Sequence, residues 1–174
     1  MKEITDGVYV AIITPFTNND TIDYESLEKL INYHNNIGTN GIVLLGTTGE
    51  SPTLDYDEQK DLVQFVNKIK NKLNLIIGVG GNNTKKVIEF TKWCNSFADG
   101  LMVTVPNYNK PSQDGIYMHF KTISENTKLP IMMYNIPSRC GVNMNFETVV
   151  KLYNNCVNIK AIKEASGSLG QIQD

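Results

Sequence analysis

A lysine close to residue 174 has the surroundings that amine chemistry requires. Residues 157–168 read Val-Asn-Ile-Lys-Ala-Ile-Lys-Glu-Ala-Ser-Gly-Ser. As a strand, this stretch places Ile159, Ala161 and Lys163 on one face, so that Lys163 ends an apolar row just before a loop. A partly desolvated lysine is more readily present as the neutral amine, a nucleophile that forms Schiff bases with carbonyl compounds. The alternative is an edge lysine whose charge simply reaches water.

Other residues suited to chemistry lie at or just after the ends of further apolar runs. They are Gly46, Thr47, Thr48, Tyr108, Tyr134 and Arg139. Hydroxyls, phenols and a guanidinium beside an amine suit proton transfer and the binding of carboxylates. The absence of a carboxylate pair or a His/Cys cluster among them argues against glycosidase or metallohydrolase chemistry. Taken singly, each residue could instead belong to a tight loop, a core contact or the charged surface.

Six apolar runs alternate with helical patterns along the chain. The runs cover residues 8–14, 41–45, 75–79, 101–105, 131–135 and 159–163, and the first reads as a strand buried on both faces. Asp23 is expected to cap the first helix, whose apolar face runs to Ile37, and Asp55 with Glu58 predicts a capping box for the second. The spacing of Phe146, Val149, Val150 and Tyr153 marks the last helix.

Alternating strands and helices predict an α/β protein with a parallel sheet. The first strand is followed by Thr-Pro-Phe and not by a GxGxxG or GxxxxGK turn, which favours a (β/α)8 TIM barrel over a nucleotide-binding sheet. A whole barrel needs eight units and typically about 250 residues. Residues 1–174 are therefore expected to form a partial barrel domain of about six β/α units, with the remaining strands and C-terminal helices absent from this chain.

The composition argues against a nucleic-acid-binding, membrane-spanning or disulfide-rich protein. The chain has 174 residues, a net charge of −2, 41% hydrophobic residues and no basic stripe, so no nucleic-acid partner is expected. No apolar run approaches the roughly 18 residues of a membrane span, and the amino terminus lacks a signal region, which predicts a cytoplasmic protein. Three cysteines without CxxC spacing and two distant histidines predict packing roles, with no metal and no disulfide framework.

Four motifs together resemble the signatures of the dihydrodipicolinate synthase family, within the wider group that includes N-acetylneuraminate lyase. They are Gly-Thr-Thr-Gly-Glu-Ser at 46–51, Pro-Asn-Tyr-Asn-Lys-Pro-Ser at 106–112, Tyr-Asn-Ile-Pro-Ser-Arg-Cys-Gly at 134–141 and Ile-Lys-Glu-Ala-Ser-Gly at 162–167. The resemblance covers essentially the whole chain, in the family's order. It implies a cofactor-free lyase in which Lys163 forms a Schiff base with pyruvate. The enamine then attacks L-aspartate 4-semialdehyde to give 4-hydroxy-tetrahydrodipicolinate, on the route to diaminopimelate and lysine.

The resemblance also implies a role for each matching residue. Thr47, Tyr134 and Tyr108 would relay protons, with Tyr108 reaching in from a neighbouring subunit. The threonine pair Thr47 and Thr48 would hold the pyruvate carboxylate, with Gly46 in the same substrate-binding turn. Arg139 would bind the carboxylate of the aldehyde. The family resemblance further implies a homotetramer, a dimer of dimers, for a complete chain.

Related proteins leave alternatives open. N-acetylneuraminate lyase and the 2-keto-3-deoxysugar-acid aldolases share the fold and the Schiff-base lysine, although the lyase type generally has Gly-Ser-Thr-Gly-Glu in the first motif and lacks the arginine after Pro-Ser. Thr47 and Arg139 favour the synthase type. Family members run to nearly twice this length, so a non-catalytic barrel fragment is the other alternative.

Overall fold

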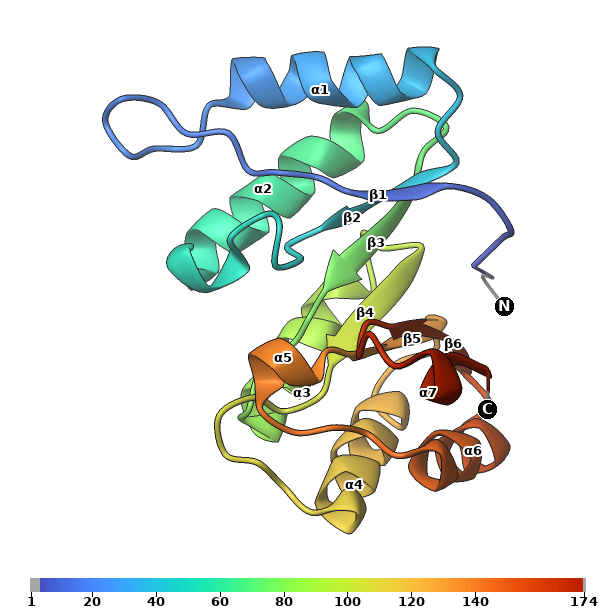
Figure 1. Ribbon diagram of the computed structural model, residues 1–174. Helices are drawn as coiled ribbons and strands as arrows, with labels where there is room; N and C mark the ends of the chain where they lie inside the picture. The colour runs from blue at the N-terminus through green and yellow to red at the C-terminus, as the bar shows by residue number, and fades with distance from the viewer. Residues whose placement is uncertain (1–3, 174) are drawn as a thin grey trace. The chain divides into compact units, whose positions relative to one another are not determined.

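The computed structural model describes residues 4–173, which form two compact units (Figure 1). The first unit contains residues 5–78 and 97–99, and the second contains residues 4, 79–96 and 100–173. In each unit three parallel strands follow one another in chain order. Helices lie between the strands in sequence, as the alternating pattern predicts.

The first unit carries strands β1 to β3. Its elements are β1 (Tyr9–Ala11), α1 (Tyr24–Asn36), β2 (Gly41–Leu44), the 3-10 helix η1 (Ser51–Thr53), α2 (Tyr56–Ile69) and β3 (Asn74–Gly78). The consecutive β3 residues Leu75, Ile76 and Ile77 are all buried, so both faces of this strand are covered. Burial on both faces is typical of a parallel sheet.

Polar residues start the helices of this unit where the sequence predicts them. The Asp23 carboxylate accepts a hydrogen bond from the backbone N–H of Ser26 at 3.0 Å. The Asp55 carboxylate accepts from the backbone N–H of Glu58 at 2.9 Å, and the Glu58 carboxylate accepts in return from that of Asp55 at 2.8 Å. These N–H groups have no partner within their helices, so the caps fix where α1 and α2 begin.

The second unit carries strands β4 to β6. Its elements are α3 (Thr84–Cys94), β4 (Gly100–Thr104), α4 (Gln113–Ser124), β5 (Ile131–Asn135), α5 (Pro137–Cys140), α6 (Phe146–Asn155), β6 (Ile159–Glu164) and α7 (Leu169–Gln173). Helix α4 lies between α3 and α6 (Figure 1). Its buried residues Ile116, Phe120 and Ile123 form the apolar face that the helical spacing predicts.

Asn158 ties the beginning of β6 to the end of α4 and the chain that follows it. Its side chain is 4% exposed, and Nδ2 donates to the carbonyl oxygens of Ser124, Thr127 and Leu129 at 3.1, 3.0 and 3.3 Å. A hollow of about 1030 Å³ lies beside the Asn158 side chain. Lys92, Asn95, Glu125, Asn126, Lys128 and Val157 are among the residues that line it.

Two expectations about the first unit are wrong in part. Strand β1 is shorter than the predicted 8–14, and Val8 and Ile13 are 64% and 53% exposed, so this run is not buried on both faces. Among residues 4–173, β1 pairs only with β2, and an edge strand keeps less cover than a central one. Ile37 is the C-cap of α1 and is exposed, because the helix ends one residue before it.

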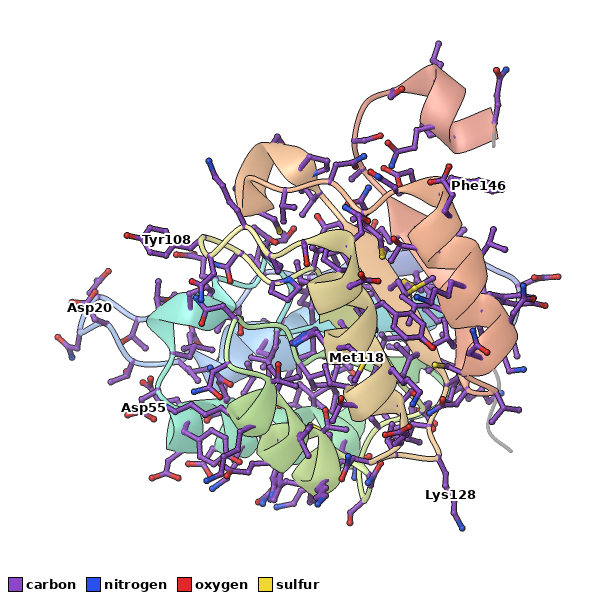
Figure 2. The ribbon with its side chains drawn as sticks, turned by 90° about the horizontal axis from the view of Figure 1, so that it is seen from below. Asp20, Asp55, Tyr108, Met118, Lys128 and Phe146 are labelled. Carbon is purple, nitrogen blue, oxygen red and sulfur yellow. The ribbon has the colours of Figure 1, made fainter. Side chains whose placement is uncertain are left out.

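Helix α6 forms where its apolar spacing predicts it, but most of the residues that mark it are not its buried face. Phe146, Val150 and Tyr153 are 45%, 38% and 62% exposed, and Figure 2 shows Phe146 pointing outward at the start of the helix. Thr148 is buried in their place, because its hydroxyl donates to the Gln113 side-chain oxygen of α4 at 2.7 Å. Apolar periodicity does not detect a face whose polar member is satisfied by a hydrogen bond.

Candidate active site

Lys163 and Tyr134 lie side by side at the carboxyl ends of two neighbouring strands. In the β5–β6 pairing, Tyr134 is the direct partner of Lys163, which places both side chains on the same face of the sheet. The Lys163 Nζ lies 4.3 Å from the centre of the Tyr134 ring. Tyr134 is buried and Lys163 is half-buried, so the amine sits against an aromatic face at the edge of the protein interior.

The apolar row expected beside Lys163 is shorter than the strand alternation suggests. Ile159 pairs with Ile131 but Ala161 pairs with Met132, so the register shifts by one residue at Lys160. Such an irregularity sends the residues before it to the opposite face. Ala161 and Lys163 therefore share a face, whereas the prediction that Ile159 lies on it is wrong.

The next pair along the strands, Asn135 and Glu164, points to the other face. The Asn135 Nδ2 donates to the two Glu164 carboxylate oxygens at 2.9 and 3.3 Å. Burial raises the pKa of Glu164, but hydrogen bonds from Asn135, Ser166 and Gln171 outweigh it and hold that pKa below its usual value. As the sequence predicts, Glu164 points away from Lys163 and forms no ion pair with it.

Tyr108 and Arg139 come from two segments that contact each other. The backbone N–H of Tyr108 donates to the carbonyl oxygen of Cys140, the residue after Arg139 on α5, at 3.2 Å. The Tyr108 side chain is 86% exposed and projects from its loop (Figure 2). Its φ of 68° lies in the left-handed region, which is unusual for a residue other than glycine and stores strain. Arg139 is exposed, and no carboxylate within residues 4–173 forms an ion pair with it.

Gly46, Thr47 and Thr48 form a turn in the first unit, directly after β2. The Gly49 N–H donates to the Gly46 carbonyl oxygen at 3.1 Å, and the Thr14 hydroxyl donates to the Gly49 carbonyl oxygen at 2.7 Å. Both threonine side chains are exposed, whereas both glycines are buried. The turn therefore presents two hydroxyls to a ligand. Because it belongs to the other compact unit, its approach to Lys163 stays a prediction.

The hollow beside Asn158 is not the candidate active site. It lies at the amino-terminal ends of β5 and β6, the opposite end of these strands from Lys163. Within residues 4–173, no group of three His, Cys, Asp or Glu side chains is arranged to hold a metal ion.

Burial raises the pKa of the Cys94 thiol to about 12, so this cysteine is not a thiolate nucleophile near neutral pH. No helix of the described chain is both long and apolar enough to cross a membrane.

Sequence reasoning missed Asn135 as a residue of this site. It is fully buried and lies immediately after Tyr134 at the end of β5. A polar amide at the end of a continuous apolar run was the available signal, because a buried amide requires partners. The structure supplies one such partner in Glu164, which itself follows Lys163.

The parallel β/α units define an α/β barrel protein. Its candidate nucleophile is the lysine amine that lies against a tyrosine at the strand ends. The sequence model of the Dihydrodipicolinate synthetase family matches residues 4–174. The chain belongs to this family. It corresponds to about the first six β/α units of the barrel, as the sequence predicts.

Individual relatives agree with this assignment. The 4-hydroxy-tetrahydrodipicolinate synthase of Endomicrobium trichonymphae is 47% identical over 168 residues, 95% of this chain and 57% of that protein. The structure of dihydrodipicolinate synthase from Aquifex aeolicus matches with a TM-score of 0.92 and 42% identity over 97% of this chain and 58% of that one. The chloride-inhibited enzyme from Acinetobacter baumannii, solved in complex with pyruvate, has a TM-score of 0.91 and 41% identity over 95% of this chain and 57% of its own. The chain thus spans less than three fifths of these relatives.

Proposed function

We propose that this chain is the Lys163-bearing part of a 4-hydroxy-tetrahydrodipicolinate synthase, acting on pyruvate and L-aspartate 4-semialdehyde. The observation that carries the proposal is the Lys163 Nζ held 4.3 Å from the Tyr134 ring at the carboxyl ends of β5 and β6. In a parallel α/β barrel this end of the strands carries the active site. The relative solved with pyruvate supports pyruvate as the carbonyl compound.

In the proposed reaction, the neutral Lys163 amine adds to the C2 carbonyl carbon of pyruvate, and loss of water leaves a protonated imine. Loss of a proton from C3 gives an enamine, which forms a carbon–carbon bond to the aldehyde carbon of L-aspartate 4-semialdehyde. The aldehyde oxygen takes up a proton and becomes a hydroxyl. The amino group of the second substrate then adds to the imine carbon and displaces Lys163, which closes the ring of the product.

The chain's own residues have distinct proposed roles in these steps. The Tyr134 phenol adjoins the amine and would pass protons during imine formation, together with the hydroxyls of Thr47 and Tyr108. Thr48 and the Gly46 turn would hold the pyruvate carboxylate with hydroxyl and backbone N–H donors. Arg139 would bind the carboxylate of the aldehyde, because a planar guanidinium matches a carboxylate with two hydrogen bonds. The proposed reaction uses no metal and no cofactor.

The assembly of the complete protein is part of the proposal. An aromatic side chain that is 86% exposed on a strained loop is available to a second copy of the chain, which supports a dimer in which Tyr108 enters the neighbour's site. We propose a cytoplasmic homotetramer, a dimer of dimers, in which residues 1–174 form part of one barrel domain. The proposed pathway is diaminopimelate and lysine biosynthesis.

An assay of the full natural polypeptide that contains residues 1–174 tests the function. We expect product to form only when pyruvate and L-aspartate 4-semialdehyde are both supplied, and Lys163→Ala to abolish its formation. Lys160→Ala is the matched control, because Lys160 is an exposed lysine of the same strand, and it should retain activity. Release of pyruvate from N-acetylneuraminate or a 2-keto-3-deoxysugar acid, without turnover of the aldehyde, would contradict the proposal. Absence of all three activities in the folded protein would favour a non-catalytic role.

A further inference from the structure

A polar cluster centred on one buried amide lies on the face of β5 and β6 opposite to Lys163. Its centre is Asn135, which is 0% exposed and makes hydrogen bonds with both ends of its side-chain amide. Nδ2 donates to the Glu164 carboxylate at 2.9 Å and to the Asn143 side-chain oxygen at 2.8 Å. The side-chain oxygen accepts from the Met144 backbone N–H at 3.0 Å. Both the nitrogen and the oxygen of this side-chain amide therefore have hydrogen-bond partners.

The Glu164 carboxylate is held from several sides. Besides Asn135, it accepts from the Ser166 backbone N–H at 2.7 Å and from the Gln171 Nε2 at 3.1 Å. Gln171 in turn donates to the Asn143 side-chain oxygen at 3.1 Å. The carboxylate thus joins β5, β6 and α7, and a half-buried charge with this many donors costs free energy when any of them is removed.

These contacts fix the strand ends that carry the candidate nucleophile. Asn135 follows Tyr134, and Glu164 follows Lys163, so the two pairs are successive partners in one ladder and lie on opposite faces. The ladder continues one residue further, where the Ala165 N–H donates to the Asn135 carbonyl oxygen at 2.9 Å. A slip of one residue here would turn Lys163 to the other face.

The same contacts also direct the carboxylate next to Lys163. A carboxylate within roughly 4 to 6 Å of an amine favours its charged form, which is not nucleophilic. The donors on Asn135, Ser166 and Gln171 hold the Glu164 carboxylate on the far face. Lys163 therefore faces a phenol ring and has no ion pair with its sequence neighbour.

We propose that Asn135 and Glu164 are positioning residues for Schiff-base formation: their hydrogen bond keeps β5 and β6 in register, so that Lys163 stays over Tyr134 with the adjacent carboxylate bonded elsewhere. This inference rests on the proposed function of Lys163. Neither residue contacts the reacting atoms, and both act through the placement of the amine.

A donor–acceptor exchange tests the proposal in the full natural polypeptide. Asn135→Asp keeps the size of the side chain but replaces the donor with a second carboxylate beside Glu164. Glu164→Gln is the milder single change, since it removes the charge and keeps an oxygen for the Ser166 N–H. In the double variant the Gln amide donates to the Asp carboxylate, which restores one hydrogen bond and one negative charge.

The first readout is the rate at which borohydride fixes pyruvate on Lys163, mapped by peptide mass. We expect a loss of about tenfold or more in Asn135→Asp, comparable to the loss of one hydrogen bond to a charged group, and recovery to within about threefold of the parent in the double variant. Gln113→Ala is the matched control. It removes hydrogen bonds to Asn143 and Thr148 in the outer part of the cluster but touches neither Asn135 nor Glu164. It should lower the unfolding midpoint and leave trapping unchanged.

The second readout does not require pyruvate. Competitive acetylation with acetic anhydride compares the reactivity of Lys163 with that of Lys160 in the same molecule. The ratio should fall in Asn135→Asp and recover in the double variant. Absence of pyruvate trapping in the parent would refute the proposed function, and the acetylation ratio would still test the positioning role. A ratio unchanged by Asn135→Asp, or one that follows only the unfolding midpoint across all variants, would overturn the inference.

Discussion

Removing the guanidinium of Arg139 should weaken the use of L-aspartate 4-semialdehyde in the proposed reaction and leave the reaction with pyruvate unchanged. Arg139 lies on the short helix α5 after β5, is exposed, and has no ion-pair partner within residues 4–173. Its replacement therefore breaks no described ion pair, and Arg139→Ala should leave the fold intact. The turn proposed to bind pyruvate comes from a different strand end, after β2, so imine formation should not depend on Arg139.

The size of the effect follows from the contact that is lost. A hydrogen bond to a charged group is worth about 1.5 to 3 kcal/mol, which corresponds to a loss of roughly 10- to 150-fold in kcat/KM for the aldehyde. Arg139→Lys keeps the charge but not the planar pair of donors, so it should fall between the parent and Arg139→Ala. Trapping of pyruvate on Lys163 should be unchanged in both variants.

Steady-state rates at saturating pyruvate, with the aldehyde varied, measure this effect. Lys110→Ala is the matched control: Lys110 is an exposed cation whose side chain approaches Gly141, the C-cap of the same helix α5. It should keep the parent's kcat/KM. The reasoning is refuted if Arg139→Ala uses the aldehyde as well as the parent does, or if it loses pyruvate trapping to the same extent.

Three further predictions concern stability. Asn158→Ala leaves three carbonyl groups, two of them in buried hydrogen bonds, without their shared donor and should lower the free energy of unfolding by about 2 to 4 kcal/mol in urea titrations. Asn155→Ala removes an exposed amide with one carbonyl partner and should cost under about 0.5 kcal/mol. Burial lowers the pKa of His119 from its ordinary value of 6.5 to about 4, so stability should decline as pH falls from about 6.5 toward 4. His119→Leu should flatten that decline, and an unchanged pH slope would contradict the burial argument. Tyr108→Asn should raise the free energy of unfolding by up to about 1 kcal/mol, because asparagine tolerates the left-handed conformation, while condensation activity falls; a less stable variant would count against backbone strain at this position.

Local signals in the sequence were sufficient for most element boundaries. Strand β5 has the predicted bounds, Ile131–Asn135, because it is a short apolar run between Pro130 and Pro137, neither of which can donate a backbone hydrogen bond. The capping box of α2 was also predictable from local sequence, because Asp55 and Glu58 are three residues apart and each side chain accepts a hydrogen bond from the other's backbone N–H.

Features that depend on a partner element could not be predicted in this way. The register shift at Lys160 exists only in relation to Ile131 and Met132 of the neighbouring strand, so alternation along β6 alone placed Ile159 on the wrong face. Thr148 is buried because Gln113 of another helix accepts its hydroxyl hydrogen. The types of the candidate site residues could be identified from sequence, but the Asn135–Glu164 hydrogen bond on the opposite face from Lys163 required the strand pairing.

The proposed function is tested most directly by identifying the amine that reacts with pyruvate. The full natural polypeptide is incubated with pyruvate and borohydride, digested, and its peptides are weighed by mass spectrometry. We predict irreversible inactivation with one pyruvate-derived adduct on Lys163, the amine held 4.3 Å from the centre of the Tyr134 ring, and none on Lys160. An adduct on another lysine, or an active and folded protein that gains no adduct, would contradict it.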